Sequence, residues 1–199
     1  MKGYDPMFKL LVTCMVTSIL AATATAAEVP DVVRQYADAY AKSPLAQQQP
    51  ASASAATDDY ARWFLQGFTH PAYGTGPVTD LRSDAYANGQ NHARTHPSER
   101  DAILAGYGYQ AVERNGAWRR GFETTAFLPD DAEKESWWMT SYGGLGFSAI
   151  GLADTGGRHP PTRVRITGYL SPRGNYGHMG GYRYEVLVTS GALIDTDAN

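Results

Sequence analysis

One glycine-rich segment, residues 168–182, gathers side chains suited to holding a ligand. Arg173, Tyr176, His178 and Tyr182 lie close together along it. A guanidinium, two aromatic rings and an imidazole on a glycine-permissive backbone suit sugars or protein surfaces, and loops commonly carry such groups. The segment therefore predicts a recognition loop with these four residues as its binding side chains.

The same segment has a purely structural interpretation, which its turn residues favour. Pro172 and Gly174 suit a tight turn, and Tyr176 would then fold over the end of the domain. Alanine substitution separates the two roles. Lost stability would indicate structure, whereas lost ligand binding in a stable protein would indicate a site.

Two adjacent tryptophans, Trp137 and Trp138, are the next candidates. Successive side chains of a strand point to opposite faces, so one indole is expected in the core and the other outside it. Trp138 is the candidate platform on which a sugar or a base would stack. Simple packing of the domain is the favoured alternative.

Two glutamates, Glu123 and Glu185, lie in expected strands between apolar neighbours, where burial raises the pKa of a carboxyl group. Two such groups about 5 Å or more apart can cleave a glycoside. Together with His178 they would make a periplasmic hydrolase. The sequence favours structural carboxylates instead, bonded to arginines such as Arg165 or Arg183.

Two other patterns are too incomplete to predict chemistry. His92 and His96 have the spacing of a helical metal pair, but Pro97 disfavours helix at His96, and the glutamate of a zinc-protease motif is missing. Ser148 follows Gly-Phe but lacks the second glycine and the expected strand–helix context of a nucleophile elbow. We therefore predict no catalytic residue, no metal ligand and no cofactor.

The elements that must position these side chains are helices first and strands afterwards. Helices are expected over residues 30–40, 57–68, 83–95 and 97–105, and strands over 109–113, 117–127, 136–142, 163–170 and 184–189. The pair Asn115-Gly116 predicts a hairpin turn between the first two strands. The expected fold is α+β, with N-terminal helices packed on a small five-stranded antiparallel β-barrel.

The sequence GYLSPRGNYGH at 168–178, the strand over 118–127 and the tryptophan pair support a resemblance. Over residues 107–190 the chain resembles uncharacterised bacterial exported proteins that end in a barrel of the oligonucleotide/oligosaccharide-binding (OB) type. The resemblance implies an OB-like barrel and no particular activity.

The first 27 residues have the order of a secretory signal peptide: a positive start, an apolar run and small residues before Glu28. Cleavage is expected near Ala26 or Ala27, which removes the only cysteine, Cys14, and with it any disulfide. The remaining divisions are an N-terminal helix (28–43), a low-complexity linker (44–56), a helical segment (57–106) and the barrel domain (107–194).

Charge and location narrow the partner. The chain has 17 basic and 20 acidic residues without a basic block, so nucleic acid is not expected as a ligand. No membrane span is expected in the mature form. We therefore expect a periplasmic or secreted, non-enzymatic binding protein of the bacterial envelope, with a protein or a glycan as its ligand. The hydrolase is the alternative, and the oligomeric state is left open.

Overall fold

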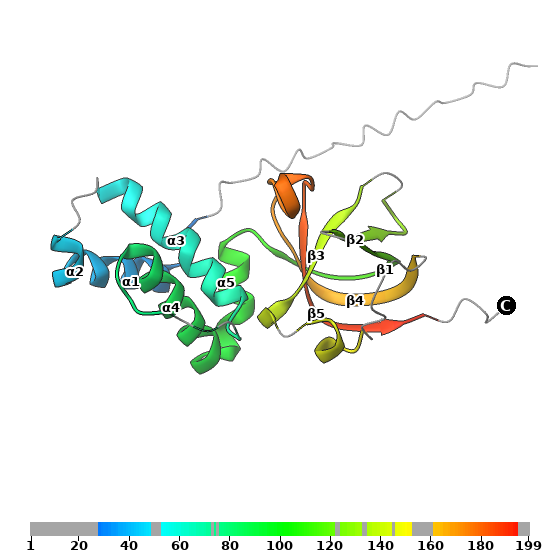
Figure 1. The fold of residues 1–199 in the computed structure, drawn as a ribbon, viewed down its shortest axis with the longest axis horizontal. Coiled ribbons are helices and arrows are strands. Elements are labelled where there is room, and N and C mark those ends of the chain that lie inside the picture. Colours follow the sequence, from blue (N-terminus) through cyan, green and yellow to red (C-terminus); the bar gives the residue numbers. More distant parts are fainter. Residues whose placement is uncertain are drawn as a thin grey trace, which may run out of the picture.

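The structure is a computed structural model with a helical half and a β-barrel half (Figure 1). It describes residues 28–48, 53–72, 74, 76–121, 124–132, 135–144, 146–152 and 161–194, with the backbone alone for 53–55. The expected signal peptide and its cleavage site lie outside these residues. Among the helices described, none has the length and apolar character that a membrane crossing requires.

The helical half precedes the barrel in the chain (Figure 1). Its described α-helices are α1 (Asp31–Ala41), α2 (Pro44–Gln47), α3 (Ala53–Thr69), α4 (Leu81–Thr95) and α5 (Arg100–Gly106). A capping box starts α4: the Asp80 side chain accepts from the Ser83 amide, and the Ser83 hydroxyl accepts from the Asp80 amide. This fixes where α4 begins and therefore which of its faces meets α3.

Two glycines allow α3 and α4 to touch through their backbones. A Cβ on Gly67 would lie 2.0 Å from the Tyr86 carbonyl oxygen, and one on Gly89 would lie 2.1 Å from the Phe64 carbonyl oxygen. Phe64 and Phe68 are fully buried beside this contact. The close approach therefore sets the packing of the helical core.

The sequence predicts a linker over 44–56, whereas the structure has helix at both ends of this range, in α2 and in the first turn of α3. The Ser43 side chain caps α2 by accepting a hydrogen bond from the Ala46 amide at 3.2 Å, and Pro44 takes the first helical position. Alanines favour helix even where little is buried, which explains the early start of α3. Residues 49–52 lie outside the described part of the chain.

Five strands close into a barrel in the order β1-β2-β3-β5-β4. They are β1 (Gln110–Gly121), β2 (Thr124–Pro129), β3 (Trp137–Ser141), β4 (Thr162–Leu170) and β5 (Glu185–Leu193). The α+β class and the five-stranded barrel after the helices are confirmed, and the barrel is consistent with an OB-like one.

The expectation of a purely antiparallel barrel is wrong at one pairing. Strands β3 and β5 run parallel, with Trp138 opposite Glu185, while the other pairings are antiparallel. The cause is the long connection after β3, because it leads the chain to pair β4 with β1. The last strand, β5, then lies between β4 and β3, antiparallel to β4 and parallel to β3.

The turn predicted at Asn115-Gly116 is also wrong, because both residues lie inside β1. A Cβ on Gly116 would lie 2.3 Å from the Leu128 carbonyl oxygen and 2.6 Å from the Phe127 ring. The glycine therefore serves close packing within the barrel rather than a turn. The Asn115 side chain accepts a hydrogen bond from Arg165 on β4 at 3.0 Å.

Arg100 makes several of the contacts that join the helices to the barrel. Arg100 at the start of α5 lies between the rings of Tyr142 and Tyr169, with its guanidinium carbon 5.4 and 5.5 Å from their centroids. Its Nε donates to the Tyr169 hydroxyl at 2.9 Å. Leu187 on β5 adds a buried apolar contact to the helical core. The helical half therefore covers β4 and β5 near Tyr169 and Leu187, at the end of these strands that carries the loop described next.

Candidate functional site

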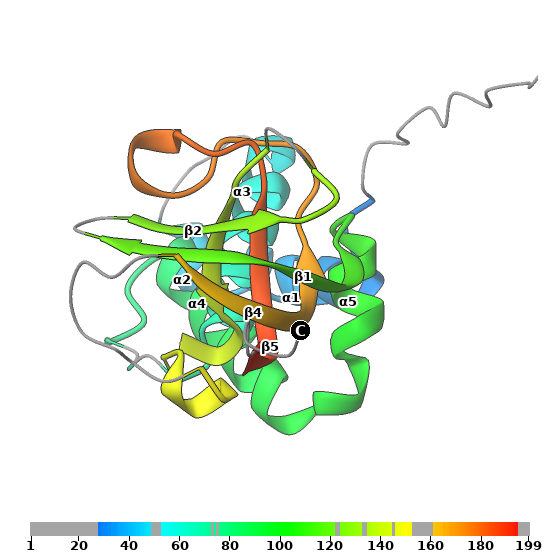
Figure 2. The ribbon, with the colours of Figure 1, turned by 90° about the vertical axis from the view of Figure 1, so that its right-hand side faces the viewer.

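The four candidates of the glycine-rich segment fall in one connection, residues 171–184, here called the β4–β5 loop. Figure 2 shows it in orange, projecting from the barrel beyond β2 and β3. The loop is a hairpin: the Gly174 amide donates to the Arg183 carbonyl at 2.9 Å, and Tyr176 and Tyr182 exchange backbone hydrogen bonds of 2.8 and 3.1 Å. These bonds extend the β4–β5 pairing, so the loop has a defined shape.

Trp138 on β3 supports the loop from below. Its ring centroid lies 5.3 Å from that of Tyr182, and its amide donates to the Tyr184 carbonyl at 2.8 Å. The Gly177 backbone lies against the indole so closely that a Cβ there would be 2.5 Å from the ring. The Tyr176 hydroxyl donates to the Pro172 carbonyl at 2.9 Å. Three of the five predicted binding residues, Trp138, Tyr176 and Tyr182, thus hold the loop in place.

The other two candidates, Arg173 and His178, are exposed on the same loop. At the tip of the loop lies a residue that the sequence analysis missed, Met179, which is 91% exposed. The available signal was its position: a lone apolar side chain among glycines, at 177, 180 and 181, has little to pack against. The structure therefore divides the loop into supporting residues and displayed ones.

The loop is basic in an acidic chain. Residues 171–184 contain Arg173, His178 and Arg183 and no carboxylate, and both arginines are exposed. Neither arginine forms an ion pair with a carboxylate of the described residues. Other arginines are neutralised, among them Arg163, which donates to Asp130 at 2.6 Å. The loop therefore presents positive charge to solvent.

A hollow of about 240 Å³ lies beside the loop and shares Trp138 with it. Strand β3 contributes residues 138–141 to its lining, and His70, which follows α3, comes from the helical half. Three residues with hydroxyl groups, Thr125, Thr140 and Ser141, are among those that line it. Since these residues come from distant parts of the sequence, no local pattern predicts the hollow. Its remaining lining residues are Met139, Gly144, Gly146 and Phe147.

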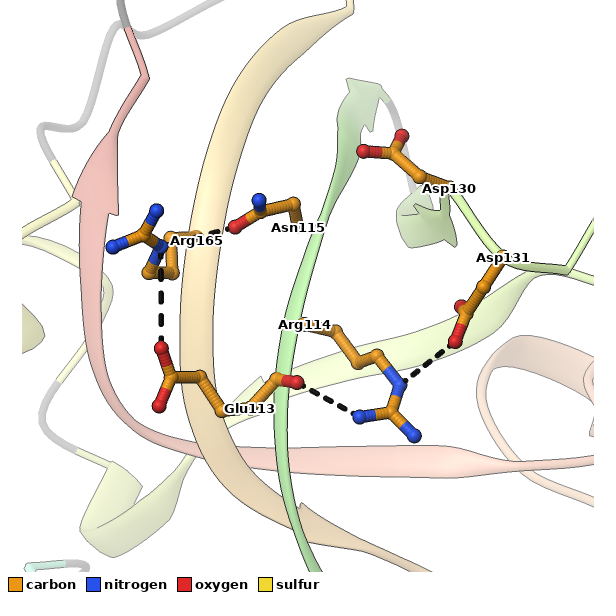
Figure 3. A pocket seen from close by; sticks show the side chains of 6 residues that line it. All are labelled: Glu113, Arg114, Asn115, Asp130, Asp131 and Arg165. Atoms are coloured by element: carbon orange, nitrogen blue, oxygen red, sulfur yellow. Dashed lines mark hydrogen bonds and ion pairs between the residues drawn. The ribbon is translucent and has the colours of Figure 1, made fainter.

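A larger groove, about 450 Å³, is lined by charged residues of β1, β4 and the turn after β2, together with Asn115 (Figure 3). Its side chains pair with one another: Arg114 lies 3.2 Å from Asp131, and Arg165 lies 4.0 Å from Glu113. Exposed pairs of this kind contribute little and leave no net charge for a ligand. The groove is therefore a solvated polar face and a weaker candidate than the β4–β5 loop.

Of the two carboxylates considered for the alternative hydrolase, only Glu185 lies among the described residues. Glu123 lies outside them, and His178 is on the exposed side of the loop. Glu185 accepts a hydrogen bond from the Thr140 hydroxyl at 3.0 Å, rather than from Arg165 or Arg183. Burial raises the pKa of the Glu185 carboxyl, and the Thr140 hydrogen bond opposes the shift. The hydrolase therefore stays a prediction.

The raised pKa makes Glu185 a source of pH-dependent stability. A group whose pKa is raised by folding stabilises the protein below its unfolded pKa, about 4.3 for glutamate, and loses that contribution as the pH rises through the folded value. Glu185→Gln, which cannot ionise, should therefore gain stability relative to the parent as the pH rises from about 4 to 7. Denaturant midpoints at both pH values measure this, and a difference that does not change with pH would contradict the assignment.

The two histidines with metal-like spacing do lie together, although Pro97 follows the second. The rings of His92 and His96 stack with centroids 4.4 Å apart. His92 is buried, with its Nε2 3.1 Å from a Glu99 carboxylate oxygen and its Nδ1 3.4 Å from the Tyr36 hydroxyl. His92 is thus satisfied within the helical core, and the described residues contain no group of three histidine, cysteine or acidic side chains placed to hold a metal ion.

No protein-family model matches the chain, and neither a curated protein nor a solved structure is significantly similar to it.

Proposed function

We propose that this chain is an exported, non-enzymatic binding protein of the bacterial envelope, and that the β4–β5 loop is its recognition element. The ligand is a protein or a glycan. One observation carries the proposal: Trp138 and Tyr182 hold the loop from below, while Arg173 and Met179 remain exposed on it.

Physical chemistry supports this division of roles. A loop whose backbone is already hydrogen-bonded and packed loses little conformational entropy when it binds. Exposed side chains such as Arg173 and Met179 bury little surface and contribute little to folding. Recognition explains their display on an ordered loop, whereas fold stability does not.

The neighbouring hollow favours a glycan as one form of the ligand. Thr125, Thr140 and Ser141 bring hydroxyl groups to its lining, and Trp138 brings an aromatic ring. Sites for small polar ligands combine such a surface with a few directed polar groups. A glycan would contact the hollow and the base of the loop together.

The test compares a loop variant with a matched surface variant. Arg173→Ala/His178→Ala should retain at least tenfold less ligand from an envelope fraction than the parent, with an unchanged thermal midpoint. Arg119→Ala, which removes an exposed arginine from β1, should retain as much as the parent. Protein and glycan eluates are both quantified by mass spectrometry.

Two outcomes would contradict the proposal. Equal retention by the loop variant and the parent would remove the β4–β5 loop as the recognition element. Conversion of a retained glycan to shorter fragments by the parent, but not by Glu185→Gln, would show an enzyme and support the hydrolase instead.

A further inference from the structure

We infer that the partner of the β4–β5 loop is a protein with an acidic cleft, and that Met179 is the side chain inserted into an apolar pocket of that cleft. The inference rests on the proposed function, because it names the ligand class for the same loop. Three features of the loop carry it: the display of Met179, the positive charge at the base of the loop, and the engagement of the aromatic rings that support it.

The backbone holds Met179 outward. Its φ of +54° is in the left-handed region, where a residue with a side chain costs about 1 kcal/mol, and no other described non-glycine residue has a positive φ. The turn around it is closed by hydrogen bonds from the Gly180 amide to the Gly177 carbonyl at 3.2 Å and from the Gly181 amide to the His178 carbonyl at 3.3 Å. The tip therefore has a defined conformation that displays the side chain.

Met179 is also the most exposed of the large apolar side chains described. It is 91% exposed, compared with 53% for Leu193 and 48% for Val78. A thioether side chain is flexible and polarisable and fits irregular apolar pockets in protein partners. Because the loop projects from the barrel (Figure 2), its tip complements a concave surface rather than a flat one.

Charge complementarity defines the rim of that concave surface. Arg173 and Arg183 lie at the base of the hairpin, where the Gly174 amide bonds to the Arg183 carbonyl, and the loop has no carboxylate of its own. The two arginines form no ion pair within the described residues, whereas Arg114 and Arg163 are paired with aspartates. These two unpaired arginines steer association towards a negative surface and would form hydrogen-bonded ion pairs there.

The same features argue against a glycan or a simple polyanion at the tip. A thioether gains little from phosphate or sugar hydroxyls, because its favourable contacts are apolar. The rings that a sugar would stack on, those of Trp138 and Tyr182, already contact each other and the Gly177 backbone. An apolar anchor at the tip and two arginines at the base of the loop match a protein cleft that has an apolar floor and acidic walls.

Site-specific crosslinking tests the inference. The chain has one cysteine, so Cys14→Ala gives a background in which Met179→Cys or Val78→Cys introduces a single thiol. Each purified chain is labelled with benzophenone maleimide, mixed with an envelope fraction and irradiated, and the adducts are sequenced by mass spectrometry. Val78→Cys is the control because Val78 is also an exposed apolar residue.

The expected result has three parts. The labelled Met179→Cys chain forms an adduct with a protein, at a site that is surrounded by Asp and Glu residues of that protein. The labelled Val78→Cys chain does not form this adduct. Arg173→Glu/Arg183→Glu lowers the yield of that adduct at least tenfold. Once the crosslinked protein is purified, Met179→Ala binds it at least tenfold more weakly than the parent, while the Arg119→Ala control binds it as the parent does.

The failures are distinguishable. A 179 adduct with a glycan, or with a protein surface that lacks acidic residues, overturns this inference and leaves the proposed function standing. Equal affinity of Met179→Ala and the parent also overturns it. If Arg173→Ala/His178→Ala retains as much ligand as the parent does, the proposed function itself is overturned.

Discussion

Replacing Gly177 with alanine is expected to separate the β4–β5 loop from Trp138 and to lower ligand retention at least tenfold. Gly177 has φ +70° and ψ −168°, a combination that is open essentially to glycine alone and costs other residues about 1–3 kcal/mol. The added Cβ would also lie 2.5 Å from the Trp138 ring and 2.9 Å from the Tyr182 ring. Both strains are relieved only if the loop moves.

Gly181→Ala is the matched control in the same loop. Gly181 has φ −72°, and a Cβ there would meet its nearest neighbour, the His178 carbonyl oxygen, at 3.5 Å, an ordinary contact. Its free energy of unfolding and its ligand retention should change little, within about 0.5 kcal/mol for stability. Equal ligand retention by Gly177→Ala and Gly181→Ala would show that the supported shape of the loop is not needed.

The largest loss of stability is expected from Gly89→Ala in α4. The new Cβ would lie 2.1 Å from the Phe64 carbonyl oxygen and 2.8 Å from the Phe68 amide nitrogen, both backbone atoms of α3. Backbone cannot rotate away as a side chain can, so the two helices must move apart and expose buried rings. We expect a loss of about 3 kcal/mol or more, against a gain of about 1 kcal/mol in helix propensity.

Denaturant unfolding followed by far-UV circular dichroism measures this loss. Gly121→Ala is the control, because a Cβ there would have only the Thr124 side chain nearby, at 3.8 Å. Its midpoint should stay close to that of the parent. If Gly89→Ala unfolds at the parent's midpoint, the helices are not in backbone contact.

Local patterns were sufficient for much of the fold. In β4, alternation predicts that Val164 and Ile166 face one way and Arg165 the other, and the structure buries both apolar residues and exposes the arginine. Likewise, Trp137 is buried while Trp138 lies on the opposite face of β3. These features depend on strand periodicity, which a single sequence displays.

The pairing of strands that are distant in the chain could not be predicted from the sequence. Nothing local distinguishes a β5 that runs antiparallel to β3 from one that runs parallel to it, because both present the same alternating residues. Asn115-Gly116 has the composition of a turn, and only the closeness of Phe127 explains its place inside a strand. Similarly, residues 44–56 have the composition of a linker, although the short helix α2 begins there, capped by Ser43.

The candidate site was predicted only in part, because part of it depends on contacts between residues that are distant in the chain. Residues contiguous in the chain, such as Arg173 and His178, necessarily fall in one loop. Their division into supports and displayed groups depends on the hairpin ladder and on Trp138, which is distant in sequence. Met179 was missed because exposure of an apolar residue is a property of the folded backbone. The hollow was not predicted, because His70 from the helical half and the barrel residues that line it come together only in the folded chain.

The most direct test of the central claim is an NMR titration of the ¹⁵N-labelled chain with the ligand eluted from the parent protein. If the β4–β5 loop is the recognition element, the largest amide shifts will fall at residues 173–183, with smaller ones at Trp138. Shifts concentrated in the charged groove around Arg114 and Asp131, with the loop amides unmoved, would contradict it.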